Sequence, residues 1–123
     1  MEGPPTKEEL KLKEVAGVQN PTVAWARRHG IRATKLQGVG NRSQPDYIFW
    51  IKGGRPLLIE FKRPGEVPTP LQTHTLNEFF NDGYDVEVHD TNDSAIKAIS
   101  LYAAKAQIVQ QTGRVGVNRS PRD

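Results

Sequence analysis

The chain has 123 residues, a net charge of +3 and no cysteine. A chain of this length is expected to fold as one domain around a single hydrophobic core. The absence of cysteine excludes a disulfide scaffold, a zinc site with thiolate ligands and thiol catalysis. Because no apolar run is long enough to cross a bilayer and the first ten residues are strongly polar, we expect neither a membrane span nor a secretory signal.

The charges are distributed unevenly along the chain. Residues 27–63 contain nine Lys and Arg against two acids, whereas residues 64–93 contain seven acids and neither Lys nor Arg. A basic stretch can bind a polyanion by releasing the counter-ions of that polyanion. Two oppositely charged halves of one surface can equally attract each other, so charge alone leaves both interpretations open.

Apolar periodicity and turn residues divide the chain into eight predicted elements. In chain order these are helices at 6–15 and 21–30, strands at 31–36, 47–52 and 56–63, a helix at 71–81, a strand at 84–89 and a helix at 94–110. Gly17 and Asn20-Pro21 are expected to separate the first two helices, and Asn92 or Asp93 is expected to cap the last one. We expect a domain at 1–110, followed by a basic, flexible tail at 111–123.

The order of these elements predicts the fold class. Gly53-Gly54 indicates a hairpin between the second and third strands. A hairpin followed by a strand–helix–strand unit predicts an α/β fold in which helices flank a mixed β-sheet.

The third strand combines an apolar face with a charged one. Alternation places the apolar residues of Leu57–Phe61 on one face, and Glu60 and Lys62 on the other. Asp46 directly precedes the neighbouring strand, and the Gly53-Gly54 hairpin folds that end of the strand back towards Glu60. Two carboxylates and one lysine are therefore expected to converge at one end of the hairpin.

Such a group suits metal-assisted cleavage of a phosphodiester. Carboxylate oxygens are the ligands that Mg²⁺ prefers, and the metal completes its shell with water and phosphate. A neighbouring lysine can orient the attacking water or stabilise the charge of the transition state. The plainer alternatives are an exposed ion pair for Glu60 and Lys62, and a turn residue for Asp46.

These residues also resemble a known signature. Pro45-Asp46, thirteen intervening residues and Glu60-Phe61-Lys62 are similar to the catalytic signature of the PD-(D/E)XK nuclease superfamily. The surrounding motifs resemble the virus-type replication-repair nuclease domain, VRR-NUC, in its small stand-alone phage form. They are Lys35–Gln37, Gly40–Asp46, Ile59–Gly65, Pro68–Gln72 and Gly83–Val86. The resemblance covers about residues 25–90 and implies a restriction-endonuclease-like core.

The resemblance implies roles for individual residues. Asp46 and Glu60 match the metal-binding carboxylates of the family, and the backbone carbonyl of Phe61 would add a ligand. Lys62 matches the catalytic lysine. Gln72 matches the glutamine of a Pro-x-x-x-Gln segment that points to the active site from the start of a helix. Without the resemblance, Gln72 would be interpreted as a solvent-exposed residue of a first helical turn.

The family also has a glutamate on its first helix that completes the metal shell. Glu14 is our choice for this role, and Glu9 and Gln19 are the alternatives. Because the predicted break between the first two helices disturbs the match, a solvated helix face is the competing interpretation of Glu14.

The function implied by the resemblance is a Mg²⁺- or Mn²⁺-dependent DNA endonuclease. It would act as a homodimer on branched DNA, such as four-way junctions, during phage replication, recombination or repair in the bacterial cytoplasm. Lys35, Arg42 and Arg63 are the candidates for phosphate contacts, and the apolar residues of the last helix are a candidate dimer interface (Ile96, Ile99, Ile108 and Val109). The alternatives are a catalytically inactive nucleic-acid-binding module of the same fold, and a structural phage protein whose basic half binds an acidic partner.

Overall fold

The computed structural model describes residues 3–36 and 44–113, with side chains described up to residue 106. The elements, in chain order, are α1 (Lys7–Glu14), a π-helical turn η1 (Val15–Gln19), α2 (Asn20–Arg28), β1 (Arg32–Lys35), β2 (Tyr47–Trp50), β3 (Pro56–Phe61), α3 (Pro70–Asn81), β4 (Asp85–His89) and α4 (Asn92–Gly113). The predicted order of helices and strands is confirmed, and most of the element ends lie within two residues of their predicted positions.

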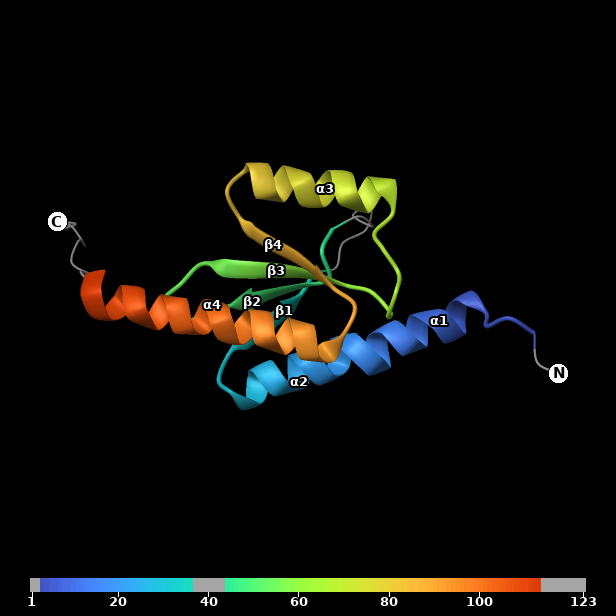
Figure 1. The fold of residues 1–123 in the computed structure, drawn as a ribbon, viewed down its shortest axis with the longest axis horizontal. Helices are drawn as coiled ribbons and strands as arrows, with labels where there is room; N and C mark the ends of the chain where they lie inside the picture. The colour runs from blue at the N-terminus through green and yellow to red at the C-terminus, as the bar shows by residue number, and fades with distance from the viewer. Residues whose placement is uncertain (1–2, 37–43, 114–123) are drawn as a thin grey trace.

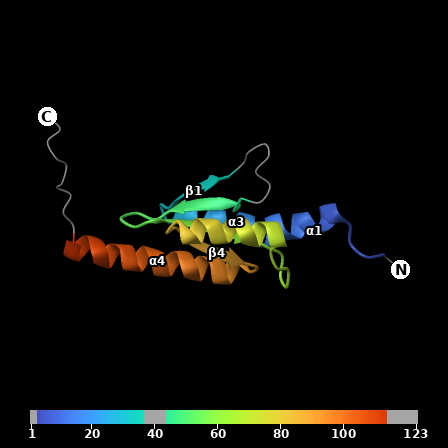
Figure 2. The ribbon, with the colours of Figure 1, turned by 90° about the horizontal axis from the view of Figure 1, so that it is seen from above.

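The strands form one mixed sheet in the order β1-β2-β3-β4. The first three strands pair antiparallel, and β3 pairs parallel with β4 after the chain crosses over through α3. Figure 1 shows α3 on one face of the sheet and α2 and α4 on the other, and Figure 2, seen from above, shows α3 in front of β4. The predicted α/β class with a mixed sheet flanked by helices is therefore confirmed.

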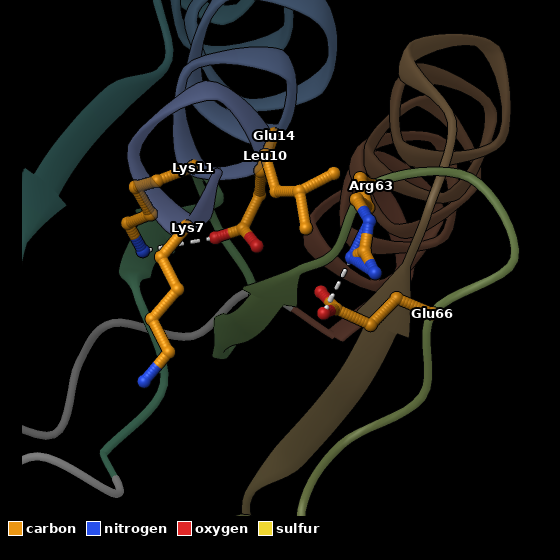
Figure 3. A pocket seen from close by; sticks show the side chains of 6 residues that line it. All are labelled: Lys7, Leu10, Lys11, Glu14, Arg63 and Glu66. Carbon is orange, nitrogen blue, oxygen red and sulfur yellow. Dashed lines mark hydrogen bonds and ion pairs between the residues drawn. The ribbon is translucent and has the colours of Figure 1, made fainter. Parts of the chain in front are cut away.

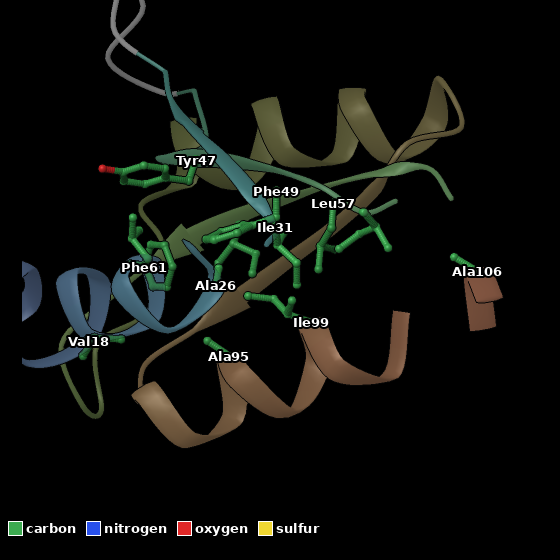
Figure 4. Packing of buried hydrophobic residues seen from close by; sticks show 13 residues of the cluster. Val18, Ala26, Ile31, Tyr47, Phe49, Leu57, Phe61, Ala95, Ile99 and Ala106 are labelled. Carbon is green, nitrogen blue, oxygen red and sulfur yellow. The ribbon is translucent and has the colours of Figure 1, made fainter. Parts of the chain in front are cut away.

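The hydrophobic core lies between the sheet and the layer of α2 and α4 (Figure 4). Leu57, Ile59 and Phe61 are fully buried there, as the alternation of β3 predicts, together with Phe49 of β2 and Ile99 of α4. Burying a side chain of this size stabilises the folded chain by roughly 1.5–3 kcal/mol. The layer fixes β3 firmly, and the charged residues at the end of β3 are held in place with it.

The predicted break between the first two helices is wrong. The chain stays helical from α1 to α2 through η1, in which the N–H of Asn20 donates to the carbonyl of Val15. A π turn adds one residue to the helical turn, which makes room for Pro21, whose ring would clash with the carbonyl four residues back in an α-helix. Glu14, which precedes this turn, and Gln19, which is its last residue, are both buried.

The start of α4 also differs from the prediction. The hydroxyl of Thr91 accepts from the N–H of Ser94 at 3.1 Å, so Thr91 caps the helix in place of Asn92 or Asp93. The Asn92 side chain instead accepts from the hydroxyl of Thr22 at 3.0 Å, and thereby ties α4 to α2.

The far end of α4 bears on two further expectations. The helix continues to Gly113, three residues into the segment predicted as a tail, and residues 114–123 lie outside the described part of the chain. Ile99, a member of the candidate dimer interface, is used in the chain's own core, and Ile96 is half-buried. The side chains of Ile108 and Val109 lie beyond those that are described. Along the described residues, no helix is long and apolar enough to cross a membrane.

Candidate active site

Asp46 is fixed at the end of the central hairpin by two backbone contacts. Its side-chain Oδ2 accepts from the N–H of Phe61 at 2.8 Å, and its own N–H donates to the carbonyl of Ile59 at 3.1 Å. The antiparallel register, which pairs Tyr47 with Ile59, explains both contacts. The structure therefore brings Asp46 to the end of β3 that carries Glu60, as the hairpin predicts.

Glu60 and Lys62 form a buried ion pair. The Lys62 Nζ lies 3.2 Å from Glu60 Oε2, and the two residues are 6% and 3% exposed. The alternative of an exposed surface pair is therefore wrong. Among the described residues no group donates a hydrogen bond to the other carboxylate oxygen, Glu60 Oε1, although that atom is buried. A buried carboxylate oxygen without a partner is costly, and such sites often hold a ligand or an ion.

Glu14 is the acid that the first helix brings to this site. It is the one buried residue of α1, at 6% exposure, and its charge acts on both Asp46 and Glu60. Its Oε1 accepts from the Lys11 ammonium at 3.0 Å. Glu9 is exposed and forms a capping box with Thr6 at the start of α1, so it is used elsewhere.

The environment of the site disfavours negative charge. Burial raises the pKa of Asp46 above its ordinary value, although the hydrogen bond from the Phe61 N–H and the charge of Lys11 act in the opposite direction. Burial and the neighbouring charge of Asp46 raise the pKa of Glu60 to about 7, against the opposing effect of Lys62. Both carboxyls therefore lie where a divalent cation would relieve an unfavourable concentration of negative charge.

A pocket of about 170 Å³ opens beside Glu14. Figure 3 shows its walls, which come from α1 and from the segment that follows β3. The lining residues are Lys7, Leu10, Lys11, Glu14, Arg63 and Glu66. Arg63, a predicted phosphate contact, is half-buried and forms a 2.7 Å ion pair with Glu66 on the wall that follows β3. The pocket therefore places basic side chains next to the carboxylates.

Two further predicted site residues, Gln72 and Lys35, are not joined to this group by any contact observed among the described residues. The Gln72 side chain accepts from the N–H of Thr69 at 2.9 Å in a capping box, so it stabilises the start of α3. Lys35 is exposed at the end of β1. Arg42 lies outside the described residues. The predicted roles of these residues and of Gln19, which is buried at the end of η1, stay predictions.

The donor set fits a hard divalent cation. Glu14, Asp46 and Glu60 offer carboxylate oxygens, and Glu60 Oε1 is buried without a partner within the described structure. In the conformation described for residues 3–36 and 44–106, no three acidic or histidine side chains are grouped closely enough to form a ready-made metal site. The chemistry of the donors therefore suits Mg²⁺ or Mn²⁺, and binding would require the carboxylates to draw together.

Sequence reasoning missed Lys11. Its charge acts on Glu14, Asp46 and Glu60, and its spacing of three residues from Glu14 is the sequence signal that could have indicated the pair. The spacing alone indicates an ordinary ion pair on a helix surface, and it points to the site only when Glu14 is known to lie there.

A mixed sheet with a β3–α3–β4 crossover, and an acid–Glu-x-Lys group at the end of its central hairpin, defines the PD-(D/E)XK class. No family model matches the chain. Over 84 residues, which are 68% of this chain and 90% of the relative, the chain is 31% identical to "Putative nuclease p44" of Acyrthosiphon pisum secondary endosymbiont phage 1. A solved structure of a VRR_NUC domain aligns with a TM-score of 0.65 at 25% identity, over 73% of this chain and 97% of the solved one. The chain belongs to the VRR-NUC family of nucleases.

Proposed function

We propose that this protein is a Mg²⁺- or Mn²⁺-dependent DNA endonuclease that hydrolyses phosphodiester bonds. The observation that carries the proposal is the group at the end of β3, where a buried Glu60–Lys62 pair adjoins Asp46 and Glu14, and one oxygen of Glu60 has no partner among the described residues. Placing three acids close together, two of them buried, costs folding free energy. A protein whose fold served no purpose beyond its own packing would gain nothing from this arrangement. The p44 relative, which is named as a nuclease, supports the same activity.

Each residue of the group has a role in this proposal. The carboxylates of Glu14, Asp46 and Glu60 and the carbonyl of Phe61 would hold the cation, which supplies a water of lowered pKa and neutralises charge on the phosphate. Lys62, with its ammonium beside Glu60, orients the attacking water and stabilises the negative charge that develops on the phosphoryl oxygens. We assign Gln72 to the same site, where it would have to leave its capping contact.

The substrate that we propose is branched DNA, such as a four-way junction, bound by a homodimer. A two-fold dimer presents two equivalent sites to two strands, which suits symmetric cleavage of a junction. Lys35, Arg42 and Arg63 would contact phosphates and so position the duplex without reading its sequence. The phage origin of the p44 relative supports a role in phage DNA replication, recombination or repair in the cytoplasm of a bacterial host.

The experiment that tests this function is a cleavage assay on a labelled four-way junction, a matched linear duplex and a single strand. Each substrate is incubated with Mg²⁺, Mn²⁺ or EDTA, and the wild type is compared with Lys62→Ala and Glu60→Ala. We expect metal-dependent cleavage, strongest on the junction, that both substitutions abolish. If no substrate is cut in either metal and Glu60→Ala binds DNA as the wild type does, the protein is a nucleic-acid-binding module of the same fold.

A further inference from the structure

Lys11 is an exposed residue of α1 whose ammonium contacts a buried acid of the site. Its ammonium lies 3.0 Å from Glu14 Oε1, and its side chain is 64% exposed, whereas that of Glu14 is 9% exposed. Its charge also acts on Asp46 and Glu60. Burial by itself would lower the pKa of Lys11, but the hydrogen bond to Glu14 and the three negative charges outweigh this effect and raise that pKa. Lys11 is therefore a charged partner of the acidic group.

The two lysines of the site differ in how firmly they are held. Lys62 is buried and fixed beside Glu60, whereas Lys11 reaches Glu14 from an exposed helix surface. An ion pair with one exposed partner contributes little to stability, because water and salt compete with it. A divalent cation in contact with several carboxylates, two of them buried, is a stronger counter-ion than a single exposed ammonium.

Lys11 and a bound cation would need the same carboxylate. Glu14 Oε1 is engaged by Lys11, and within the described residues the acids are not grouped as a metal site. Lys11 itself lines the pocket beside Glu14, together with Lys7 and Arg63, so an ammonium released from Glu14 would remain in this pocket (Figure 3). With Glu14 neutralised by a cation, three basic side chains would face a single remaining acid, Glu66, and the pocket would favour an anion.

We propose that Lys11 is an exchangeable counter-ion, which pairs with Glu14 in the metal-free protein and turns to a nucleic-acid phosphate in the adjoining pocket when a divalent cation binds. This inference rests on the proposed function, because it takes Glu14 as a ligand of the cation. It assigns to α1 a phosphate contact that depends on the metal.

The first test is the affinity for Mn²⁺ alone, measured by calorimetry without DNA. The substitution Lys11→Met removes the competing ammonium, so we expect Mn²⁺ to bind roughly two- to fivefold tighter, the range that an exposed ion pair supports. Lys11→Arg keeps the charge and should bind Mn²⁺ as the wild type does. Lys13→Met removes a lysine of the same helix that does not line the pocket, and serves as the matched control. Unchanged or weaker Mn²⁺ binding by Lys11→Met would overturn the proposal.

The second test follows the binding of a four-way junction as a function of salt concentration. In Ca²⁺, we expect Lys11→Met to reduce the slope of log K against log salt by about 0.9, which corresponds to one phosphate contact. In EDTA, the wild type and Lys11→Met should have equal slopes, because Lys11 is then paired with Glu14. A slope that is the same for both proteins in Ca²⁺ contradicts the exchange.

The two tests separate this inference from the proposed function. If the wild type binds Mn²⁺ and cleaves DNA, but Lys11→Met binds Mn²⁺ no more tightly, the exchange is wrong and the nuclease assignment stands. If the wild type binds no Mn²⁺ at all, both are wrong.

Discussion

At the scale of single residues, the site is a group of charged side chains that are largely removed from water, and this removal lowers the stability of the folded chain. Glu60 has one oxygen paired with Lys62 and, among the described residues, no partner for the other. Burying a carboxylate in this way disfavours its charged form, which is the reason that its pKa rises to about 7. The unfavourable charge is useful if a cation is to bind, because the cation then relieves a penalty that the folded chain already carries.

This penalty predicts how the metal-free protein responds to pH. The pKa of Glu60 is about 7 in the folded chain and near its ordinary value of 4.5 in the unfolded chain, so the folded state binds this proton more tightly. The resulting stability is complete below pH 4.5 and is lost as the pH rises to 7, by on the order of 3 kcal/mol. Urea unfolding in EDTA, at several pH values between 4.5 and 7.5, measures this decrease in the free energy of unfolding.

The variant Glu60→Gln cannot titrate and serves as the comparison. Its free energy of unfolding should change much less over the same pH range. The slope against pH that remains should reflect Asp46, whose pKa is also raised. Equal slopes for the two proteins would show that Glu60 has an ordinary pKa in the folded chain.

Lys62 is the residue for which activity and binding should separate. We expect Lys62→Met to reduce the rate of junction cleavage by roughly 10²- to 10³-fold, the loss typical for a group that stabilises transition-state charge. Binding of the junction in Ca²⁺ should change little, because the proposed role of Lys62 is to stabilise charge that develops only in the transition state. Single-turnover cleavage and a binding titration give the two quantities, and an equal loss in both would assign Lys62 to binding alone.

At the scale of elements, the π turn decides where the first helix places its acid. In α1 the one buried residue is Glu14, and it lies immediately before η1. Removing one residue from the turn would rotate α1 by about 100° relative to α2, since an α-helix has 3.6 residues per turn. Most of α1 is exposed, so the sheet and its core do not prevent such a rotation.

Deleting Gly17 therefore tests the turn. We expect the variant to fold, because the core apart from Val18 lies outside the turn, mainly in α2, α4 and the sheet, and to lose Mn²⁺ affinity by at least about tenfold. Calorimetry measures the affinity and circular dichroism checks the fold. The control Gly17→Ala keeps the chain length, and a Cβ at this position meets no atom within 4 Å. If the deletion variant binds Mn²⁺ as Gly17→Ala does, Glu14 is not a ligand.

At the scale of the whole molecule, metal binding and stability are linked. A cation that binds only the folded chain should stabilise it by about 2.7 kcal/mol when its concentration is roughly 100 times its dissociation constant. We expect this gain for the wild type in Mn²⁺ and none for Asp46→Asn, which keeps an oxygen for the Phe61 N–H but loses the charge. Chemical unfolding with and without Mn²⁺ measures the gain.

The same experiment distinguishes the candidate acids of the first helix. Glu9→Gln should respond to Mn²⁺ as the wild type does, because Glu9 takes part in the capping box of α1, where glutamine can replace it. A loss of the Mn²⁺ response in Glu9→Gln, with the response kept in Glu14→Gln, would exchange the roles of the two residues.

Most of the fold was predictable because its signals are local. The alternation of β3, the Gly53-Gly54 hairpin and the positive-φ glycines Gly30 and Gly83, which end α2 and α3, each depend on neighbouring residues. One error occurred where a local signal conflicted with a distant contact. Asn92 resembles a helix cap in the sequence, but its side chain bonds to Thr22, which lies 70 residues away, and Thr91 caps the helix.

The sequence by itself determined the order of the elements and the place where Asp46, Glu60 and Lys62 meet, because pairing in a hairpin follows from its turn and its alternation. Only the tertiary structure decided that Glu14 is buried at this site, that the Glu60–Lys62 pair is shielded from water, and that Lys11 reaches the acids. Burial and pKa depend on elements far apart in the chain, and no local pattern of residues records how those elements pack.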